Sequence, residues 1–156
     1  MRKVVLKPDR EQSLLRRHPW IFSGAIASLP SCEKGEVLPV FSSKGDFLAT
    51  VYFHPENSLS GRVLSFVDLP IQEILTNALQ RSLKLRSTLF DPNITNSYRL
   101  INGEGDGLPG LIVDRYADVL VLQVHTYGME RLKKEIVDLL IALLSPRSII
   151  EKSVSQ

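Results

Sequence analysis

Hydrophobic and polar residues alternate over short distances in the first 69 positions of the chain, and turn residues separate one alternating run from the next. A short helix is also expected over residues 10–17, because the position before Pro19 is disfavoured in helical conformation. Short strands divided by turns are typical of a small barrel or sandwich. The strands are predicted at residues 3–7, 36–41, 47–53 and 62–67.

The pattern changes at Asp68-Leu69-Pro70, after which apolar residues recur at the spacing of an amphipathic helix. An early proline favours a helix start, so a helix is expected from about residue 71 to the Asp91-Pro92 turn. The sequence therefore predicts an α+β protein with an all-β domain at 1–69 and an α/β domain at 70–156. In the second domain we expect a second helix over 132–144, packed with the first on a short sheet whose strands lie at 99–101, 111–116, 119–125 and from 148.

The composition indicates a globular protein rather than a disordered one, because 44% of the 156 residues are hydrophobic and 23% are charged. Cys32 is the single cysteine, so an internal disulfide is excluded, which fits a reducing compartment. The start of the chain lacks the long apolar run of a signal peptide, and the longest apolar stretch, residues 139–144, is too short for a membrane helix. We therefore expect a cytoplasmic protein without a membrane partner.

Basic residues gather at the start of the chain, although the net charge is only +2. The first 17 residues hold six Lys or Arg against two Asp or Glu, and His18 and Trp20 follow directly. Guanidinium groups bind phosphate, and a Trp ring can stack on a base. One interpretation of this cluster is an RNA contact, and the other is a solvated basic face. Under both interpretations we expect Trp20 and Phe22 to lie in the barrel core. The candidate RNA-binding residues are Lys7, Arg16, Arg17, His18 and Lys44.

A glycine-rich loop, NGEGDGLPG, occupies residues 102–110. It lacks the Gly-Lys-Ser/Thr of a P-loop, and a strand rather than a helix follows it, so neither a phosphate cradle nor a dinucleotide fingerprint is favoured. Asn102, Glu104 and Asp106 offer oxygen atoms but no complete metal-ligand set, so a tight connection is favoured.

Charged residues flank this loop at Arg99, Asp114 and Arg115. They either brace the loop as an ion-pair network or face a substrate, and the sequence leaves both alternatives open. Asp114 and Arg115 are neighbours on a predicted strand, so their side chains should point to opposite faces of the sheet.

Catalytic and metal-binding residues are not predicted anywhere in the chain. Cys32 has no histidine near it in sequence, and a nucleophilic cysteine needs a group that stabilises its thiolate. The histidines at 18, 54 and 125 do not have the spacing of metal ligands.

Two stretches resemble a known family, the PUA-domain-containing 23S ribosomal RNA (cytosine-5) methyltransferases of the ribosomal RNA large subunit methyltransferase I type. They are RRHPWIFSGAI at residues 16–26, which is similar to the opening of the PUA domain, and RLINGEGDGLPGLIVDRY at residues 99–116, which resembles the central signature. The resemblance implies a PUA pseudobarrel at 1–69 and an α/β linker domain at 70–156.

Family members continue into a Rossmann-like domain that binds S-adenosylmethionine and carries the cysteine that attacks C6 of the target cytosine. The resemblance therefore implies that this chain lacks that domain, binds no cofactor itself and is inactive alone; Cys32 does not match the catalytic cysteine. We expect it to be a fragment, a split product or a truncated product, with the methyltransferase domain supplied in cis or in trans.

Two functions remain open at this point. One is the RNA-binding and substrate-positioning portion of an rRNA methyltransferase, with ribosomal RNA as its partner. The alternative is a protein-interaction or dimerisation module that docks a catalytic partner or a second copy of the chain.

Overall fold

The computed structural model describes residues 1–153 and divides the chain into two compact units, Met1–Pro70 and Ile71–Gln156. We call them the N-terminal unit and the C-terminal unit and describe each by itself. The last three positions of the predicted second domain, 154–156, lie outside the described residues.

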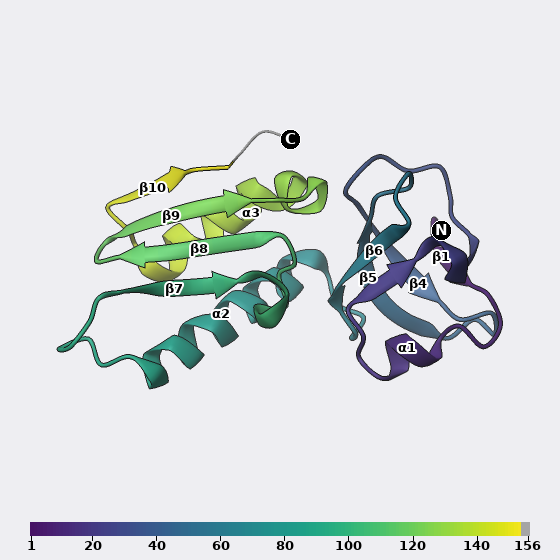
Figure 1. Cartoon of the computed structure of the whole chain (residues 1–156), viewed down its shortest axis with the longest axis horizontal. Helices are drawn as coiled ribbons and strands as arrows, with labels where there is room; N and C mark the ends of the chain where they lie inside the picture. The colour runs from purple at the N-terminus through teal and green to yellow at the C-terminus, as the bar shows by residue number, and fades with distance from the viewer. Residues whose placement is uncertain (154–156) are drawn as a thin grey trace. The chain divides into compact units, whose positions relative to one another are not determined.

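The N-terminal unit is a curled six-stranded sheet with the strand order β2-β6-β5-β4-β1-β3 (Figure 1). Strands β1 and β4 pair in parallel, and the other neighbours pair antiparallel. The elements follow one another as β1 (Val4–Leu6), α1 (Gln12–Leu15), β2 (Trp20–Phe22), the 3-10 helix η1 (Ser23–Ala25), β3 (Ile26–Ser28), β4 (Glu36–Phe41), β5 (Phe47–Phe53) and β6 (Leu59–Ser65).

The core of this unit forms around β5, of which every residue from Leu48 to Phe53 is buried. The neighbouring strand β6 can approach β5 closely because it carries Gly61. A Cβ atom at Gly61 would lie 2.8 Å from Cγ1 of Val51 and 2.9 Å from Cε1 of Phe53. Glycine is therefore the residue that lets the sheet curl tightly at this point.

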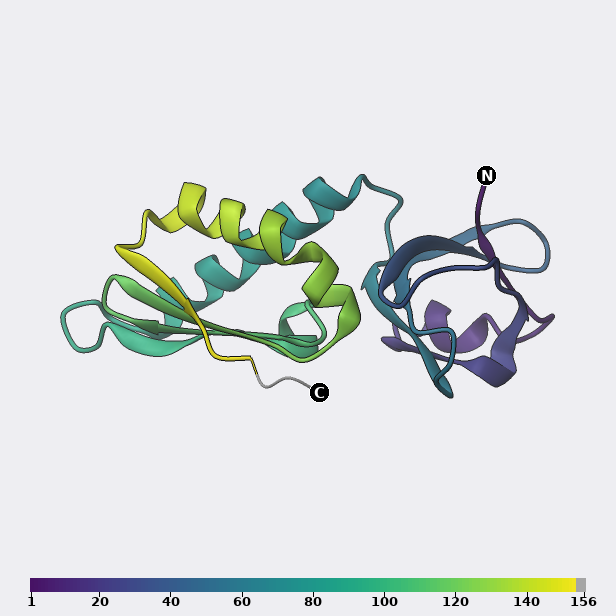
Figure 2. The same cartoon turned by 90° about the horizontal axis from the view of Figure 1, so that it is seen from above.

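The C-terminal unit has two helices that cover one face of a four-stranded sheet with the order β10-β9-β8-β7 (Figure 2). Strand β10 runs parallel to β9 because the helix between them, α3, returns the chain to the same end of the sheet. The elements are α2 (Ile71–Leu89), β7 (Ser97–Asn102), the 3-10 helix η2 (Gly103–Asp106), β8 (Leu111–Tyr116), β9 (Val119–Val124), α3 (Tyr127–Leu144) and β10 (Ser148–Glu151).

Apolar residues at helical spacing face this sheet and close the second core. Leu75, Leu79 and Ile136 are among the fully buried side chains of the helices, and Leu111 and Leu122 among those of the sheet. Thr126 caps the start of α3, where its Oγ1 accepts a hydrogen bond from the amide of Met129 at 3.2 Å.

The structure confirms the prediction of a mixed α and β protein with a curled β part, and it corrects several details. Strand β6 begins three positions before the predicted start at residue 62, and α3 begins five before 132. The short strand β3 and both 3-10 helices were not predicted. Within residues 1–153, no helix combines the length and the apolar character that crossing a membrane would require.

Candidate functional site

The first candidate site is built on the C-terminal end of α1, where Arg16 and Arg17 follow the last helical residue. The amide of Arg17 donates to the carbonyl of Leu14, and the amide of His18 donates to the carbonyl of Ser13, both at 2.9 Å. This is a Schellman motif, whose left-handed position is usually glycine. Here that position holds Arg17, with φ of 66°. An arginine at a position that favours glycine is a departure from local stability that indicates a role for its side chain.

The guanidinium of Arg17 is held in place by an aromatic ring. Its Cζ lies 4.9 Å from the centroid of Phe66, within the range of a cation–π contact. Arg16 and Arg17 are both exposed, so their guanidinium groups are accessible to an anion.

The rings of His18, Trp20 and Phe22 follow Arg16 and Arg17 in the chain and lead into β2. We call these three rings the aromatic row and the two arginines the cationic corner. The His18 and Trp20 rings meet edge to face at 5.7 Å, and the Trp20 and Phe22 rings at 6.4 Å. The amide of Trp20 donates to Nδ1 of His18 at 3.2 Å, which fixes the orientation of the imidazole.

The prediction that Phe22 lies in the barrel core is wrong, since 51% of its surface is exposed, and Trp20 is only half-buried. The reason is the alternation of side chains along a strand. Ile21 points inward and is 3% exposed, so its two neighbours point away from the core.

A cavity of about 290 Å³ opens between this row, α1, β1 and η1. We call it the α1–β2 cavity. Its walls are mostly apolar, and Arg10, Ser13 and His18 add polar groups. The other residues that line it are Leu6, Leu14, Trp20, Ile21, Phe22, Gly24 and Ala25.

The other two predicted RNA contacts lie apart from the cavity lining. Lys7 follows β1, and its amide donates to the carbonyl of Ala25, a lining residue, at 2.9 Å. Lys44 lies in the turn between β4 and β5, where its amide donates to Oγ of Ser42 at 3.2 Å. Arg10 lines the cavity but was not among the predicted contacts, although it belongs to the same basic cluster.

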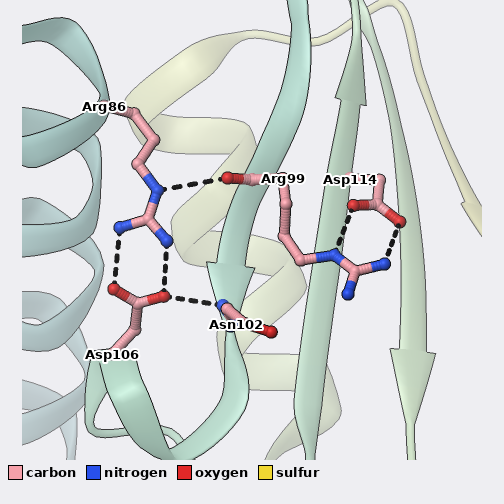
Figure 3. A network of polar contacts seen from close by, with 5 residues as sticks. All are labelled: Arg86, Arg99, Asn102, Asp106 and Asp114. Carbon is pink, nitrogen blue, oxygen red and sulfur yellow. Dashed lines mark hydrogen bonds and ion pairs between the residues drawn. The ribbon is translucent and has the colours of Figure 1, made fainter. Parts of the chain in front are cut away.

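The second candidate site is the glycine-rich loop, which is braced by a buried ion pair that the sequence did not reveal (Figure 3). Arg86 of α2 donates from Nη1 and Nη2 to the two carboxylate oxygens of Asp106, both at 2.8 Å, and from Nε to the carbonyl of Arg99 at 3.1 Å. Oδ2 of Asp106 also accepts from the amide of Asn102 at 2.6 Å. The side chains of Arg86 and Asp106 are 11% and 7% exposed, so this carboxylate is committed to holding the loop.

The flanking charged residues divide between the two faces of the sheet. Arg99 pairs with Asp114 through Nε at 2.9 Å and Nη2 at 3.3 Å (Figure 3), and this hydrogen-bonded carboxylate raises the pKa of Arg99. Arg115 instead donates to the carbonyl of Ala117 at 2.9 Å and to the Tyr98 hydroxyl at 3.3 Å. Asp114 and Arg115 thus contact different residues. Glu104, in η2, is half-buried. A contact of any of them with substrate stays a prediction.

Comparison with known proteins bears on both sites. A family model described as a PUA-like domain matches residues 4–66. Ribosomal RNA large subunit methyltransferase I of Escherichia coli (strain SMS-3-5 / SECEC) is 38% identical over 154 residues, which are 97% of this chain and 39% of that protein. The enzyme of the same name from Alteromonas mediterranea is 36% identical over 154 residues, which again are 97% of this chain and 39% of that protein. This chain matches the N-terminal portion of that methyltransferase family.

The chain spans about two fifths of the length of these curated relatives. Two solved structures share its fold at 22% identity, each over 98% of this chain. One is a Streptococcus mutans protein described as a candidate SAM-dependent methyltransferase, with a TM-score of 0.81. The other is SMU.776, a candidate methyltransferase in complex with SAH, with a TM-score of 0.83. The resemblance inferred from the two sequence stretches is confirmed by the PUA-like domain match and by the sequence relatives, and the solved structures show the shared fold.

Cys32 of the PUA-like domain lies beside Glu36 rather than beside a base that would activate it. Partial burial raises the pKa of its thiol, the Glu36 carboxylate raises it further, and the guanidinium of Arg2 opposes them with a smaller effect. Since the thiolate is the reactive form, we expect alkylation of Cys32 by iodoacetamide to be slower at pH 7 than that of a free cysteine and to accelerate as the pH rises. Mass spectrometry of quenched samples measures the rate, and alkylation at pH 7 as fast as that of a cysteine peptide would contradict this expectation.

Proposed function

We propose that this chain is the RNA-binding and substrate-positioning portion of an S-adenosylmethionine-dependent rRNA cytosine-5 methyltransferase. The PUA-like domain, residues 1–69, binds ribosomal RNA, and the α/β domain from residue 70 links it to a catalytic domain supplied in cis or in trans. The observation that carries the proposal is the cationic corner of Arg16 and Arg17 beside the exposed aromatic row of β2.

The chemistry of this corner suits a nucleic acid backbone. A guanidinium presents several N–H donors in a fixed plane and binds phosphate oxygens in pairs. Arg17 is already oriented by Phe66, so little side-chain freedom is lost when it binds. Structured RNA is recognised through backbone and shape together with a few unstacked bases, and the neighbouring rings of Trp20 and Phe22 supply the apolar part of such a surface.

The proposed linker role of the C-terminal unit is supported by the bracing of its elements. The buried Arg86–Asp106 pair joins α2 to the glycine-rich loop, and the more exposed Arg99–Asp114 pair joins β7 to β8.

The glycine-rich loop does not have the features of an S-adenosylmethionine site. The segment closest in composition to a cofactor loop is the glycine-rich loop, and its Asp106 oxygens are occupied by Arg86 and the amide of Asn102. A strand follows this loop, whereas nucleotide-binding loops of this type lead into a helix whose N-terminus faces the ligand. We therefore assign neither the cofactor nor a catalytic residue to this chain.

The proposal predicts that Arg16→Glu combined with Arg17→Glu weakens RNA binding about 10- to 100-fold, since two charge-assisted phosphate contacts are lost. The slope of log affinity against log salt should also fall by about 2, because fewer counterions are released. Fluorescence anisotropy with a labelled rRNA hairpin at several salt concentrations measures both.

Arg17→Gly provides the matched control for folding. Glycine suits the left-handed position, so this variant removes one cation without disturbing the helix cap. It should melt at the same temperature as the parent protein or at a higher one, and it should bind RNA more weakly. Equal affinity of all variants across the salt series would refute the RNA-binding role.

A second candidate function rests on the sheet face of the C-terminal unit that the helices leave open. Tyr116 and Ile150 are 54% and 46% exposed, and Val121 lies between their strands, paired with Ile150. Exposed apolar side chains on one face can dock a partner domain or a second copy. Sedimentation velocity over a concentration series tests self-association, and a monomer at every concentration excludes the dimer.

A further inference from the structure

The glycine-rich loop begins with the pair of residues in this chain that is most open to spontaneous covalent change. Asn102 is the single asparagine that a glycine follows, since the other four, at positions 57, 77, 93 and 96, precede Ser, Ala, Ile and Ser. Asparagine is a thermolabile residue, because the backbone nitrogen of the next residue can attack Cγ of its side chain. Glycine has no Cβ atom to hinder this approach. Asn102 is also exposed, so water reaches it in the folded protein.

This deamidation consumes one water and releases one ammonia. The Gly103 nitrogen gives its proton to solvent and bonds to Cγ of Asn102, and the side-chain nitrogen takes up a proton and leaves as ammonia. Water then opens the resulting cyclic imide at either of its carbonyls. The product at position 102 is an aspartate or an isoaspartate, so the chain gains one negative charge. The ring can close only when the Gly103 nitrogen lies on the same side of the Cα–C bond as Cβ.

The folded loop holds the two reacting atoms apart. Asn102 has φ of −122° and ψ of 61°. The other substituents of Cα are spaced by a third of a turn around the Cα–C bond, so this ψ places the Gly103 nitrogen directly opposite Cβ. Because Cβ carries Cγ, the nitrogen is as far from Cγ as rotation about that bond allows. Ring closure therefore requires the peptide between Asn102 and Gly103 to turn over.

Hydrogen bonds on both sides of this peptide oppose its rotation (Figure 3). The amide of Asn102 donates to Oδ2 of Asp106 at 2.6 Å, and the carbonyl of Gly103 accepts from the amide of Leu108 at 3.1 Å. Asp106 is held in turn by the two bonds from Arg86 at 2.8 Å. Since Asn102 is exposed, its protection rests on conformation rather than on burial, and that conformation depends on the buried ion pair.

We propose that Asn102 is a deamidation site that the Arg86–Asp106 pair keeps unreactive, so that opening of the loop exposes the chain to an irreversible change. Deamidation adds a negative charge to the residue whose amide the Asp106 carboxylate accepts. Like charges repel at such short range, and isoaspartate also lengthens the backbone, so the modified loop does not close as before. The inference is independent of RNA binding, and its tests contain no RNA.

The first test compares the folded chain with an unconstrained loop. The full 156-residue chain and a synthetic peptide of residues 99–110 are incubated at mildly alkaline pH. Proteolysis and mass spectrometry then measure the rate of deamidation at Asn102. We expect the folded chain to react at least about 10-fold more slowly than the peptide, because its reaction waits for local opening. Equal rates in the chain and the peptide would overturn the inference.

Arg86→Gln tests the ion pair without changing the sequence of the loop, whereas Asp106→Asn would create a second Asn-Gly pair with Gly107. Loss of the guanidinium favours the open loop, so Arg86→Gln should deamidate at Asn102 about 10- to 100-fold faster than the parent. An unchanged rate at Asn102 would contradict the proposed role of the pair.

Arg99→Gln is the matched control for this variant. It makes the same kind of substitution but breaks the more exposed pair with Asp114, so the rate at Asn102 should stay near that of the parent. Asn57 lies exposed in the N-terminal unit and serves as the internal reference. Its rate should be the same in the parent, in Arg86→Gln and in Arg99→Gln. Equal acceleration at Asn102 in both variants would show that the buried pair has no special role.

A measurement on the parent chain covers the case in which Arg86→Gln does not fold. In a series of urea concentrations, deamidation at Asn102 should accelerate before the far-UV circular dichroism of α2 and α3 is lost, because loops open at lower free energy than the unit unfolds. Acceleration only together with loss of the helical signal would mean that the ion pair guards nothing beyond the global fold, and the inference would fail.

Discussion

Replacement of Asp106 by asparagine is expected to destabilise the C-terminal unit by roughly 3–5 kcal/mol, the usual cost of removing one partner of a buried ion pair. Asparagine keeps the shape of the side chain but leaves the guanidinium of Arg86, which is 11% exposed, without its counter-charge. Urea unfolding followed by far-UV circular dichroism measures the loss. Helices α2 and α3 contain 19 and 18 residues and α1 only 4, so this signal reports mainly on the C-terminal unit.

Two controls separate this effect from a general loss of stability. Asp114→Asn breaks the Arg99 pair, in which Arg99 is 48% exposed, and should cost less than about 1 kcal/mol. Arg86→Leu together with Asp106→Leu should cost less than either change alone, because no charge is then left unpaired. A cost for Asp106→Asn as small as that for Asp114→Asn would show that the buried pair does not hold the loop.

Alanine at Gly110 is expected to destabilise the same unit by about 2–4 kcal/mol. Gly110 has φ of 88°, and its new Cβ would lie 2.4 Å from Oγ1 and 2.6 Å from Cγ2 of Thr126. The positive φ costs about 1–2 kcal/mol for a residue with a side chain. Displacement of Thr126 removes the cap of α3, which is worth about 1 kcal/mol more. Thermal unfolding followed by circular dichroism measures the change.

Gly105 offers a control in the same loop, because a Cβ atom there meets nothing within 4 Å and its φ is ordinary. Gly105→Ala should therefore leave the melting temperature nearly unchanged. Thr126→Ala in the Gly110→Ala background should cost less than the sum of the two single changes, since the clash and the cap involve the same side chain. Strict additivity would mean that the two residues do not interact.

Hydrophobic periodicity was sufficient to predict most elements because each is amphipathic by itself. Strands β4, β5 and β8 have the predicted bounds, and β10 begins at the predicted residue 148. The missed elements are those that tertiary contacts define. Strand β3 has three half-buried or exposed residues and forms because Ser28 pairs with Val5 of β1, far away in sequence. A strand of three residues is too short for the alternation of hydrophobic and polar residues to predict it.

The candidate sites show the same limit. Arg16, Arg17 and His18 were singled out because they are adjacent in sequence, whereas the sequence did not show that the fold places Arg10 with His18 in the lining of the α1–β2 cavity. Arg86 could not be paired with Asp106 in advance, because 20 positions separate a helix residue from a loop residue. The exposure of Phe22 was open to prediction from the alternation around Ile21, yet aromatic character suggested a core position.

The parallel pairing of β10 with β9 affects the order in which the protein can fold during synthesis. The PUA-like domain is complete once Ser65 has left the ribosome, and its strands, apart from the β2–β6, β1–β4 and β1–β3 pairs, join neighbours close in the chain. The C-terminal sheet must wait for α3 and for residues 148–151 before β9 is paired on both sides. Domains fold as units, N-terminal ones first, so the nascent chain presents a finished PUA-like domain while strand β9 of its second sheet is still unpaired on one side.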